Sequence, residues 1–356
     1  NSILKEMNYL KRTFLRLAAM ILVAVSALSA TITASAAVPY DSYTYWSDVG
    51  NERKEVYNRA MYEAKGVLGA VDFGVAPFTK ICDIYVDDKD NLYLLDNSSR
   101  IVVLDANFKL IREIRLINGT ESYDESSSIY VFKDGTIYIC DTTGHRVLHI
   151  TALGELIDVI TLPDSPLIPD KFDFKPTQIL RDEHDYLYVL SEGSYYGALI
   201  YDPDMEFLGF YGSNTVSATF SSVLKNISER MFPNNEKKGN TAQKLPYSFV
   251  DFTIDNKGFI YTCTGFTTRN TRKGQIRKLN PGAGTNILGS SDVNFVDTRS
   301  NLTYGGGSAY SAQDICSIAV DNNGFIYGLE SAYGKVFVYD DSCRILTSFG
   351  GGMGEG

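Results

Sequence analysis

Histidine, cysteine and tryptophan are scarce in this chain of 356 residues. It contains three histidines, five cysteines and one tryptophan. No two cysteines form a C-x-x-C pair, and the chain has no Gly-x-Ser-x-Gly elbow, zinc-binding motif or phosphate-binding loop. A dense disulfide framework is therefore excluded. Nucleophilic catalysis has little support either, because no cysteine or serine is accompanied by an adjacent base.

Basic residues are also outnumbered. Thirty-three Lys and Arg stand against 43 Asp and Glu, for a formal net charge of −10. An acidic protein repels phosphate backbones and anionic lipid, so nucleic acid is excluded as a partner.

Only the N-terminus has an extended apolar run, from Leu17 to Leu28. Three basic residues (Lys11, Arg12, Arg16) precede this run, and an Ala-Ser-Ala sequence at 34–36 follows it. This order predicts a secretory signal peptide over 1–36, with 1–6 upstream of a start at Met7. The alternative is an uncleaved membrane anchor, although the run is short for a membrane span. Cleavage removes four basic residues and one acidic residue, which changes the charge from −10 to −13.

Tyrosine and glycine, in contrast, are abundant, with 24 and 30 residues, a composition that favours an all-β fold. One pattern occurs five times: an apolar strand, a turn rich in Asp, Asn and Gly, then apolar-Tyr-x-apolar. Its tyrosines align at Tyr93, Tyr138, Tyr188, Tyr261 and Tyr327. A third strand follows in each unit, and a fourth follows in four of them, as in "KLIREI" from Lys109. Four short antiparallel strands, repeated in this way, predict the blades of a β-propeller.

The spacing of the units indicates insertions and an incomplete ring. A helical insertion is expected at 213–247 and a loop insertion at 281–312. The segment from Gly66 resembles the link that leads from one blade into the next, so it is expected to hold an orphan outer strand of a further blade. The prediction is five blades plus this strand over 66–350, six blades when complete, with an N-terminal extension at 37–65 and a truncated end at 351–356.

Candidate ligand residues come from the first strand of each unit. Side chains alternate along a strand, so every second residue lies on one face. One column is polar throughout and is expected to face the central channel: Asp83, Ser128, Gln178, Asp251 and Ser317. The next column is apolar throughout and is expected to pack between blades: Ile84, Ile129, Ile179, Phe252 and Ile318. Asp83 and Asp251 are the candidate metal ligands, for calcium or another divalent cation. The alternative is a hydrated channel in which these carboxylates bind backbone amides.

The stretch "CDTTGHRVLHI" at 140–150 brings together a cysteine, an aspartate and two histidines. Alignment of the units places Cys140 in a column of leucines, Asp141 and His145 at a turn, and His149 on the third strand. We therefore interpret it as one unit's version of a repeated hairpin and not as a metal site. Cys140 and Cys263 are expected to be buried, and Cys343 to be an exposed thiol.

With the units aligned, the chain resembles the NHL-repeat family of β-propellers from about Gly66 to Gly350. The Asp-x-x-Gly-apolar-apolar-Tyr hairpins carry the resemblance (Asp255, Gly258, Tyr261; Asp321, Gly324, Tyr327), together with the "DTTGHRV" turn. "YTYW" at 43–46 is similar to a group of exported bacterial propellers that are often described as NHL-repeat or gluconolactonase-like. Blade two departs from the pattern with Phe132 in place of aspartate, and blade three lacks the basic residue before its third strand.

Two functions follow as expectations. The first is a secreted or cell-surface propeller that binds protein or carbohydrate through its faces. The second is a metal-dependent hydrolase or lyase of gluconolactonase type that uses Asp83 and Asp251. The tyrosine content and the lack of a catalytic constellation favour the binding module, although a fold by itself does not decide function.

Overall fold

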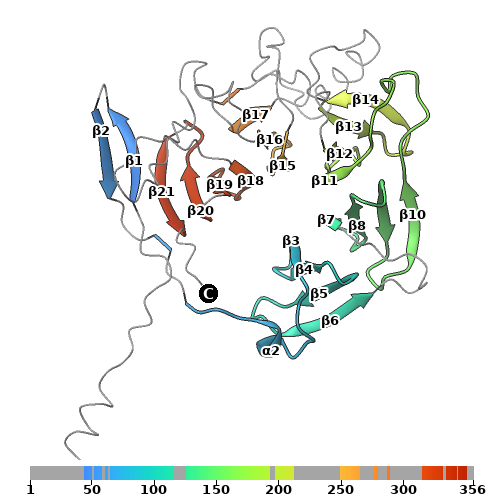
Figure 1. Cartoon of the computed structure of the whole chain (residues 1–356), viewed down its shortest axis with the longest axis horizontal. Helices are drawn as coiled ribbons and strands as arrows, with labels where there is room; N and C mark the ends of the chain where they lie inside the picture. The colour runs from blue at the N-terminus through green and yellow to red at the C-terminus, as the bar shows by residue number, and fades with distance from the viewer. Residues whose placement is uncertain are drawn as a thin grey trace, which may run out of the picture.

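The computed structural model describes residues 44–49, 52–57, 61–62, 65–115, 126–192, 197–211, 249–264, 276–279, 287–288, 315–331, 334–342 and 344–350. These residues form a ring of five antiparallel sheets, shown in Figure 1. This is the predicted all-β propeller, and each sheet is one blade.

The strands of each blade follow one another in the chain and pair in that order. Blade 1 consists of β3 (Ile81–Val86), β4 (Leu92–Asp96), β5 (Arg100–Leu104) and β6 (Leu110–Arg115). Blade 2 consists of β7 (Ser126–Val131), β8 (Ile137–Asp141), β9 (Arg146–Ile150) and β10 (Leu156–Ile160). Blade 3 consists of β11 (Pro176–Arg181), β12 (Leu187–Ser191), β13 (Ala198–Tyr201) and β14 (Phe207–Tyr211).

Blade 4 has three strands within the described residues: β15 (Asp251–Ile254), β16 (Ile260–Cys263) and β17 (Ile276–Leu279). The amide of Ile287 donates to the carbonyl of Lys278, so the chain returns beside β17 where other blades have a fourth strand. Blade 5 consists of β18 (Ile315–Val320), β19 (Ile326–Glu330), β20 (Lys335–Tyr339) and β21 (Ile345–Gly350). The first strands surround the centre, β7 packing against β3 and β11, and β15 against β11 and β18.

The turn between the first two strands explains why four of the five tyrosines align. In blade 2, which has Phe132 in place of the aspartate, the hydroxyl of Tyr138 accepts from Arg181 instead. In blade 3, Oδ1 of Asp182 accepts the amides of His184 and Tyr186 and so closes the turn. Its Oδ2 accepts the hydroxyl of Tyr188 at 3.1 Å. The same tyrosine-to-aspartate bond joins Tyr93 to Asp87, Tyr261 to Asp255 and Tyr327 to Asp321. The repeated tyrosine is therefore part of the scaffold.

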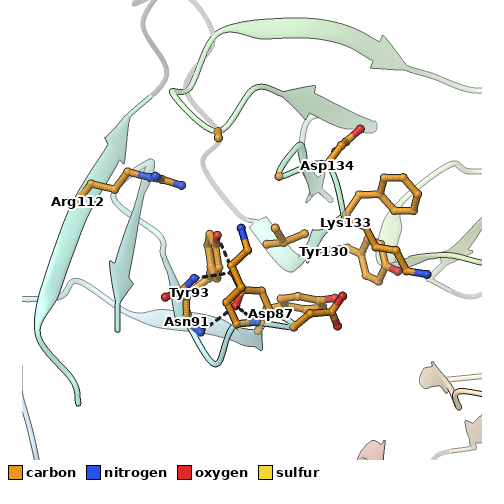
Figure 2. A pocket seen from close by; sticks show the side chains of 14 residues that line it. Asp87, Asn91, Tyr93, Arg112, Tyr130, Lys133 and Asp134 are labelled. Atoms are coloured by element: carbon orange, nitrogen blue, oxygen red, sulfur yellow. Dashed lines mark hydrogen bonds between the residues drawn. The ribbon is translucent and has the colours of Figure 1, made fainter. Parts of the chain in front are cut away.

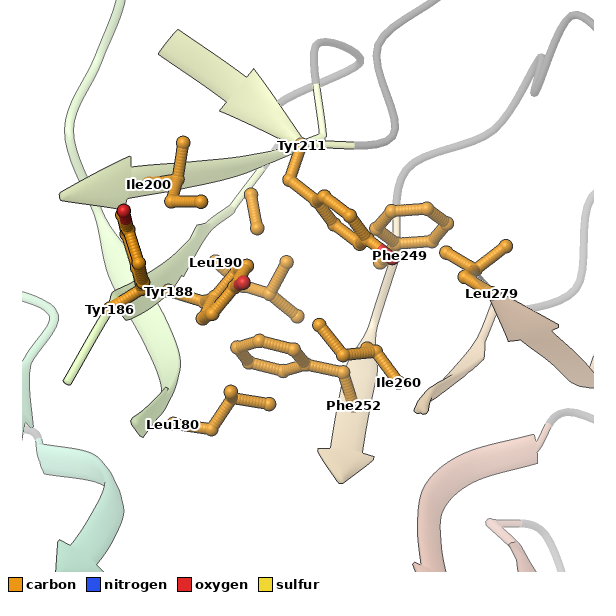
Figure 3. Packing of buried hydrophobic residues seen from close by; sticks show 11 residues of the cluster. Leu180, Tyr186, Tyr188, Leu190, Ile200, Tyr211, Phe249, Phe252, Ile260 and Leu279 are labelled. Atoms are coloured by element: carbon orange, nitrogen blue, oxygen red, sulfur yellow. The ribbon is translucent and has the colours of Figure 1, made fainter. Parts of the chain in front are cut away.

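Most of the hydrophobic core lies between neighbouring blades. Figure 3 shows the contact between blades 3 and 4, where Phe252 and Ile260 face Leu180, Tyr188 and Leu190. The other blade contacts have the same composition of β-branched, leucine and tyrosine side chains. A blade alone would leave these faces in water, so burial between blades provides the main stabilisation.

Blade 1 differs from the other blades in the exposure of one face, the face that points away from blade 2. Ile129, Ile179, Phe252 and Ile318 of the apolar column are 3–6% exposed, which confirms the expected packing. Ile84, in the same column, is 57% exposed, and nearby Val86 is 55% exposed. Figure 1 shows the ring of sheets interrupted between blade 5 and blade 1.

The N-terminal part of the chain covers the outer half of blade 1. Phe73, Val75 and Phe78 pack against a cluster formed by Leu94, Val102 and Leu104. Arg100, 1% exposed, fixes this segment: its Nε donates to Asp96, and its Nη2 donates to the carbonyls of Ala76 and Pro77.

Among the described residues around Gly66, the predicted orphan outer strand is not found. Residues 65–80 contain a single turn of helix, α2 (Ala70–Phe73), and no strand. α2 ends at Gly74, whose φ of 70° lies in the left-handed region that glycine adopts without strain. The extension at 37–65 instead contains a two-stranded hairpin of β1 (Thr44–Val49) and β2 (Glu52–Tyr57).

Several predictions fall on residues outside the described ranges. These are the signal peptide at 1–36, the helical insertion at 213–247, almost all of the loop insertion at 281–312, Cys343, and the end at 351–356. Among the described residues, no helix has the length and apolar character needed to cross a membrane.

Candidate functional site

The polar column of the first strands forms links from one blade to the next. In blade 1, Asp83 accepts the amide of Ile84 at 2.8 Å through one oxygen, and the amide of Ile129 in blade 2 at 2.9 Å through the other. The carboxylate thus joins its own strand to the neighbouring blade. A hydrogen bond from a backbone amide to an ionised carboxylate is stronger than one between neutral groups.

Asp251 repeats this arrangement between blades 4 and 5. Its Oδ1 accepts the amide of Phe252 at 2.7 Å, and its Oδ2 accepts the amide of Ile318 at 2.9 Å and the hydroxyl of Ser317 at 2.7 Å. Between blades 2 and 3, the hydroxyl of Ser128 donates to the side-chain oxygen of Gln178 at 2.5 Å. All five predicted residues are therefore involved in links between blades.

Burial changes the acidity of both aspartates. It raises the pKa of Asp251 to about 6, against the hydrogen bonds from Ser317, Ile318 and Phe252, and the charge of Asp83 adds to the increase. Burial likewise raises the pKa of Asp83 above its ordinary value, while the amides of Ile129 and Ile84 lower it. The two carboxylates thus interact electrostatically although they belong to different blades.

The carboxylates of Asp83 and Asp251 meet only some of the requirements of a cation site. All four carboxylate oxygens of Asp83 and Asp251 already accept a hydrogen bond, although each oxygen has a second lone pair. Calcium takes six to eight oxygen ligands. No group of three or more His, Cys, Asp or Glu side chains that could hold a metal ion occurs in the described part of the chain. The ligand role of this column stays a prediction.

The stretch at 140–150 is a repeated hairpin, as expected from the alignment. Cys140 is fully buried, and burial raises the pKa of its thiol well above the ordinary value. Asp141 forms an ion pair with Arg146 at 2.9 Å across the turn. His145 Nδ1 lies 2.9 Å from the carbonyl oxygen of Phe174, and the ring of His149 stacks on Tyr138 with centroids 4.1 Å apart. Cys263 is fully buried too, which confirms that prediction.

A cavity that the alignment of the first strands did not predict lies between blades 1 and 2. Its volume is about 370 Å³, and its walls come from the first turn of each blade together with β6 and the turn after β9. Figure 2 shows its lining, in which charged side chains surround a group of tyrosines. The charged residues are Asp87, Asp88, Lys89, Arg112, Lys133 and Asp134.

Two tyrosines from neighbouring blades meet at the cavity. The rings of Tyr85 and Tyr130 lie edge to face, with centroids 5.3 Å apart. The hydroxyl of Tyr130 donates to the carbonyl of Arg181, and burial raises the pKa of Tyr130 to about 12. Both hydroxyls therefore stay protonated at neutral pH, when they can donate as well as accept hydrogen bonds.

Arg112 enters the cavity from β6, on the side of Tyr93 (Figure 2). It lies opposite Val103 in the register of blade 1. The corresponding positions of blades 2, 3 and 5 hold Asp158, Gly209 and Thr347. A comparison of the fourth strands would have singled out this arginine, because it is the basic residue in a column that is otherwise small or acidic.

Comparison with known proteins shows no family for this chain. No protein-family model matches the chain, and no curated protein matches it. Among solved structures, it is similar to virginiamycin B lyase from Staphylococcus aureus at 14% identity, with 76% of this chain and 69% of that chain covered and a TM-score of 0.41.

Two Bacteroides proteins are similar to the same degree. A protein of unknown function from Bacteroides caccae is 10% identical, with 76% and 81% of the two chains covered and a TM-score of 0.44. A Bacteroides fragilis protein described as exported is 14% identical, with 76% and 71% covered and a TM-score of 0.42. At these identities the likeness concerns the fold alone.

Proposed function

We propose that this protein is a secreted or cell-surface NHL-repeat propeller that binds protein or carbohydrate and does not itself transform its ligand. The observation that carries the proposal is the cavity between blades 1 and 2. It brings aromatic rings together with polar and charged side chains that converge on one cavity, and both features occur in ligand pockets.

The proposal is supported by a difference between the polar residues that recur along the chain and those that occur in one or two blades. In four of the five units the recurring aspartate and tyrosine bind to each other within a turn, and Asp83 and Asp251 bind amides of the next blade. The cavity includes the recurring Asp87 and Tyr93, but Arg112 and the tyrosines Tyr85 and Tyr130 are particular to blades 1 and 2. Residues that recur thus maintain the ring, and residues that vary provide recognition. Secretion is inferred from the basic, apolar and Ala-Ser-Ala order of residues 11–36.

The test is a glycan array together with immobilised extracellular proteins, both probed with the intact chain and followed by titration of every hit. Saturable binding by the folded protein, absent after heat unfolding, is the expected result. If titration shows no saturable binding to any glycan or protein, the proposal is wrong.

The raised pKa of Asp251 favours a second candidate function. A carboxyl group that titrates near pH 6 is suited to general acid or base catalysis, and perturbed pKa values concentrate at functional sites. A divalent cation bound by Asp83 and Asp251 would relieve their mutual repulsion and could polarise a lactone carbonyl. This function predicts lactone hydrolysis that depends on calcium or zinc and is lost in Asp251→Asn. Equal rates for the two proteins, or no hydrolysis with either metal, would exclude it.

A further inference from the structure

Arg112 is the side chain from which a specific ligand can be inferred. It is half-buried on β6, and its Nε is shielded from water without a hydrogen-bond partner. Within the described residues, its guanidinium forms no hydrogen bond or ion pair. A buried charged donor without a partner is costly, because it has lost its hydration and gained nothing in return.

Two other cations that lie beside a repeated tyrosine have partners, although they belong to a first strand and a third strand whereas Arg112 belongs to a fourth strand. Arg181 lies between blades 2 and 3, where it donates to the hydroxyl of Tyr138, approaches Asp185 at 3.3 Å and covers the ring of Phe132. Lys278 lies beside Tyr261 in blade 4, and its Nζ is 3.6 Å from Asp255. A cation beside the repeated tyrosine is thus paired in these two cases. Arg112 also lies near Tyr93, but it has no such partner among the described residues.

Two of the three carboxylates in the cavity wall, Asp87 and Asp134, already accept hydrogen bonds. Asp87 accepts from two amides, the side chain of Asn91 and the hydroxyl of Tyr93. Oδ1 of Asp134 accepts both the amide and the hydroxyl of Thr136. Arg112 and Lys89 thus remain available to a ligand, and the cavity favours an anion although its lining carries equal numbers of acids and bases.

The size and lining of the cavity restrict the kind of anion. A stable contact with a globular protein buries about 800 Å² per partner, whereas a cavity of about 370 Å³ is in the range of small-molecule sites. Lys89, Asn91, Asp88 and Lys133 provide several donors and acceptors around the rim. Tyr85 and Tyr130 provide apolar ring surface with hydroxyl ends. A ring with several hydroxyl groups and one carboxylate matches the cationic Arg112, the polar rim and the tyrosine rings.

We propose that the cavity between blades 1 and 2 binds an acidic sugar of the hexuronate class. Arg112 donates two parallel hydrogen bonds to the carboxylate, the polar rim binds the hydroxyl groups, and the sugar ring packs against the tyrosines. This inference rests on the proposed binding function, and it names the ligand class of that function.

The test is a calorimetric titration of the intact chain with D-glucuronate, with D-glucose and acetate as comparison ligands. Glucuronate is expected to bind at least tenfold more tightly than either, because glucose lacks the carboxylate and acetate lacks the ring. Arg112→Met is expected to weaken glucuronate binding by tenfold or more, as loss of a charge-assisted pair does. Arg112→Lys should restore only part of it, since an ammonium cannot form the bidentate pair.

Arg115→Met is the matched control. Arg115 lies on the same strand with its side chain 57% exposed, and it is not part of the cavity wall. Equal affinity of Arg112→Met and Arg115→Met, or no glucuronate binding by the unsubstituted chain, would overturn the inference. If Arg112→Met unfolds, the glucuronate affinities of Arg112→Lys and of the unsubstituted chain are compared instead. Equal affinities would exclude a bidentate pair and so overturn the inference. Glycan-array hits that survive Arg112→Met would leave the binding function intact and remove this site from it.

Discussion

At the scale of single residues, four of the five tyrosines that first revealed the repeat are bound to the aspartates of their own turns. Tyr188 is fully buried, and its hydroxyl donates to Asp182, itself 3% exposed. We expect Tyr188→Phe to lower the free energy of unfolding by about 1.5 kcal/mol, the value of a hydrogen bond to a charged group. Urea denaturation measures this. Tyr186→Phe is the control, because the hydroxyl of Tyr186 forms no hydrogen bond within the described residues, and it should change stability by less than about 0.5 kcal/mol.

The raised pKa of Asp251 makes stability depend on pH. The folded state holds this proton up to about pH 6, whereas the unfolded state loses it near the ordinary value of 3.8. The folded state therefore binds more protons in this window, so the contribution of Asp251 is greatest at low pH and falls as pH rises from about 4 to 6. Its size is about 3 kcal/mol.

The measurement is the free energy of urea unfolding at several pH values for the unsubstituted chain and for Asp251→Asn. Because the amide does not titrate, the variant should lack this part of the decrease between pH 4 and pH 6. Parallel pH profiles for the two proteins would show that Asp251 has an ordinary pKa in the folded state.

At the scale of elements, the buried pair of Arg100 and Asp96 fixes the segment before β3 to the turn between β4 and β5. Asp96 accepts from Arg100 and from the amides of Thr79 and Lys80, so both sides of the connection depend on it. Removal of one partner from a buried pair leaves an uncompensated charge, which costs about 3–5 kcal/mol.

Arg100→Met should therefore destabilise the protein by about that amount. The chain offers a control of the same geometry: Arg344 Nε lies 2.7 Å from Asp340, but the arginine side chain is 77% exposed. Arg344→Met should cost at most about 1 kcal/mol, because water screens an exposed pair. Comparable losses in urea denaturation for both variants would show that burial does not determine the strength of the Arg100 pair.

At the scale of the whole molecule, blade 1 differs from the other four blades in the exposure of the face that points away from blade 2. Ile84 and Ile129 occupy the same column, but the first is 57% and the second 3% exposed. Ile129→Ala should lower the free energy of unfolding by about 2–4 kcal/mol, through lost burial and the cavity that remains. Ile84→Ala should cost less than about 0.5 kcal/mol. Equal losses would indicate that the face of blade 1 is covered in solution, which differential scanning calorimetry and urea denaturation can both establish.

Much of this arrangement could be predicted because strands and turns depend on local sequence. The alternation of Asp83 and Ile84, repeated in five units, was enough to assign one polar and one apolar column. The sequence analysis expected this polar column to face the channel and gave carboxylates that bind backbone amides as the alternative. Asp83 and Asp251 do bind such amides, and which blade supplies them depends on the angle between blades. The expected strand near Gly66 failed for a similar reason: its apolar residues pack on the outer half of blade 1 as an irregular segment, a tertiary contact that overrides the local pattern.

The sequence by itself determined the fold class, the number of blades present and the scaffold role of the stretch at 140–150, since each depends on a pattern that five units repeat. Only the tertiary structure decided where recognition can occur. The cavity between blades 1 and 2 joins Arg112 on a fourth strand to Tyr130 on a first strand of the next blade. Residues so far apart in the chain meet because blades pack side by side. That Arg112 has no partner among the described residues becomes visible only once its neighbours are known.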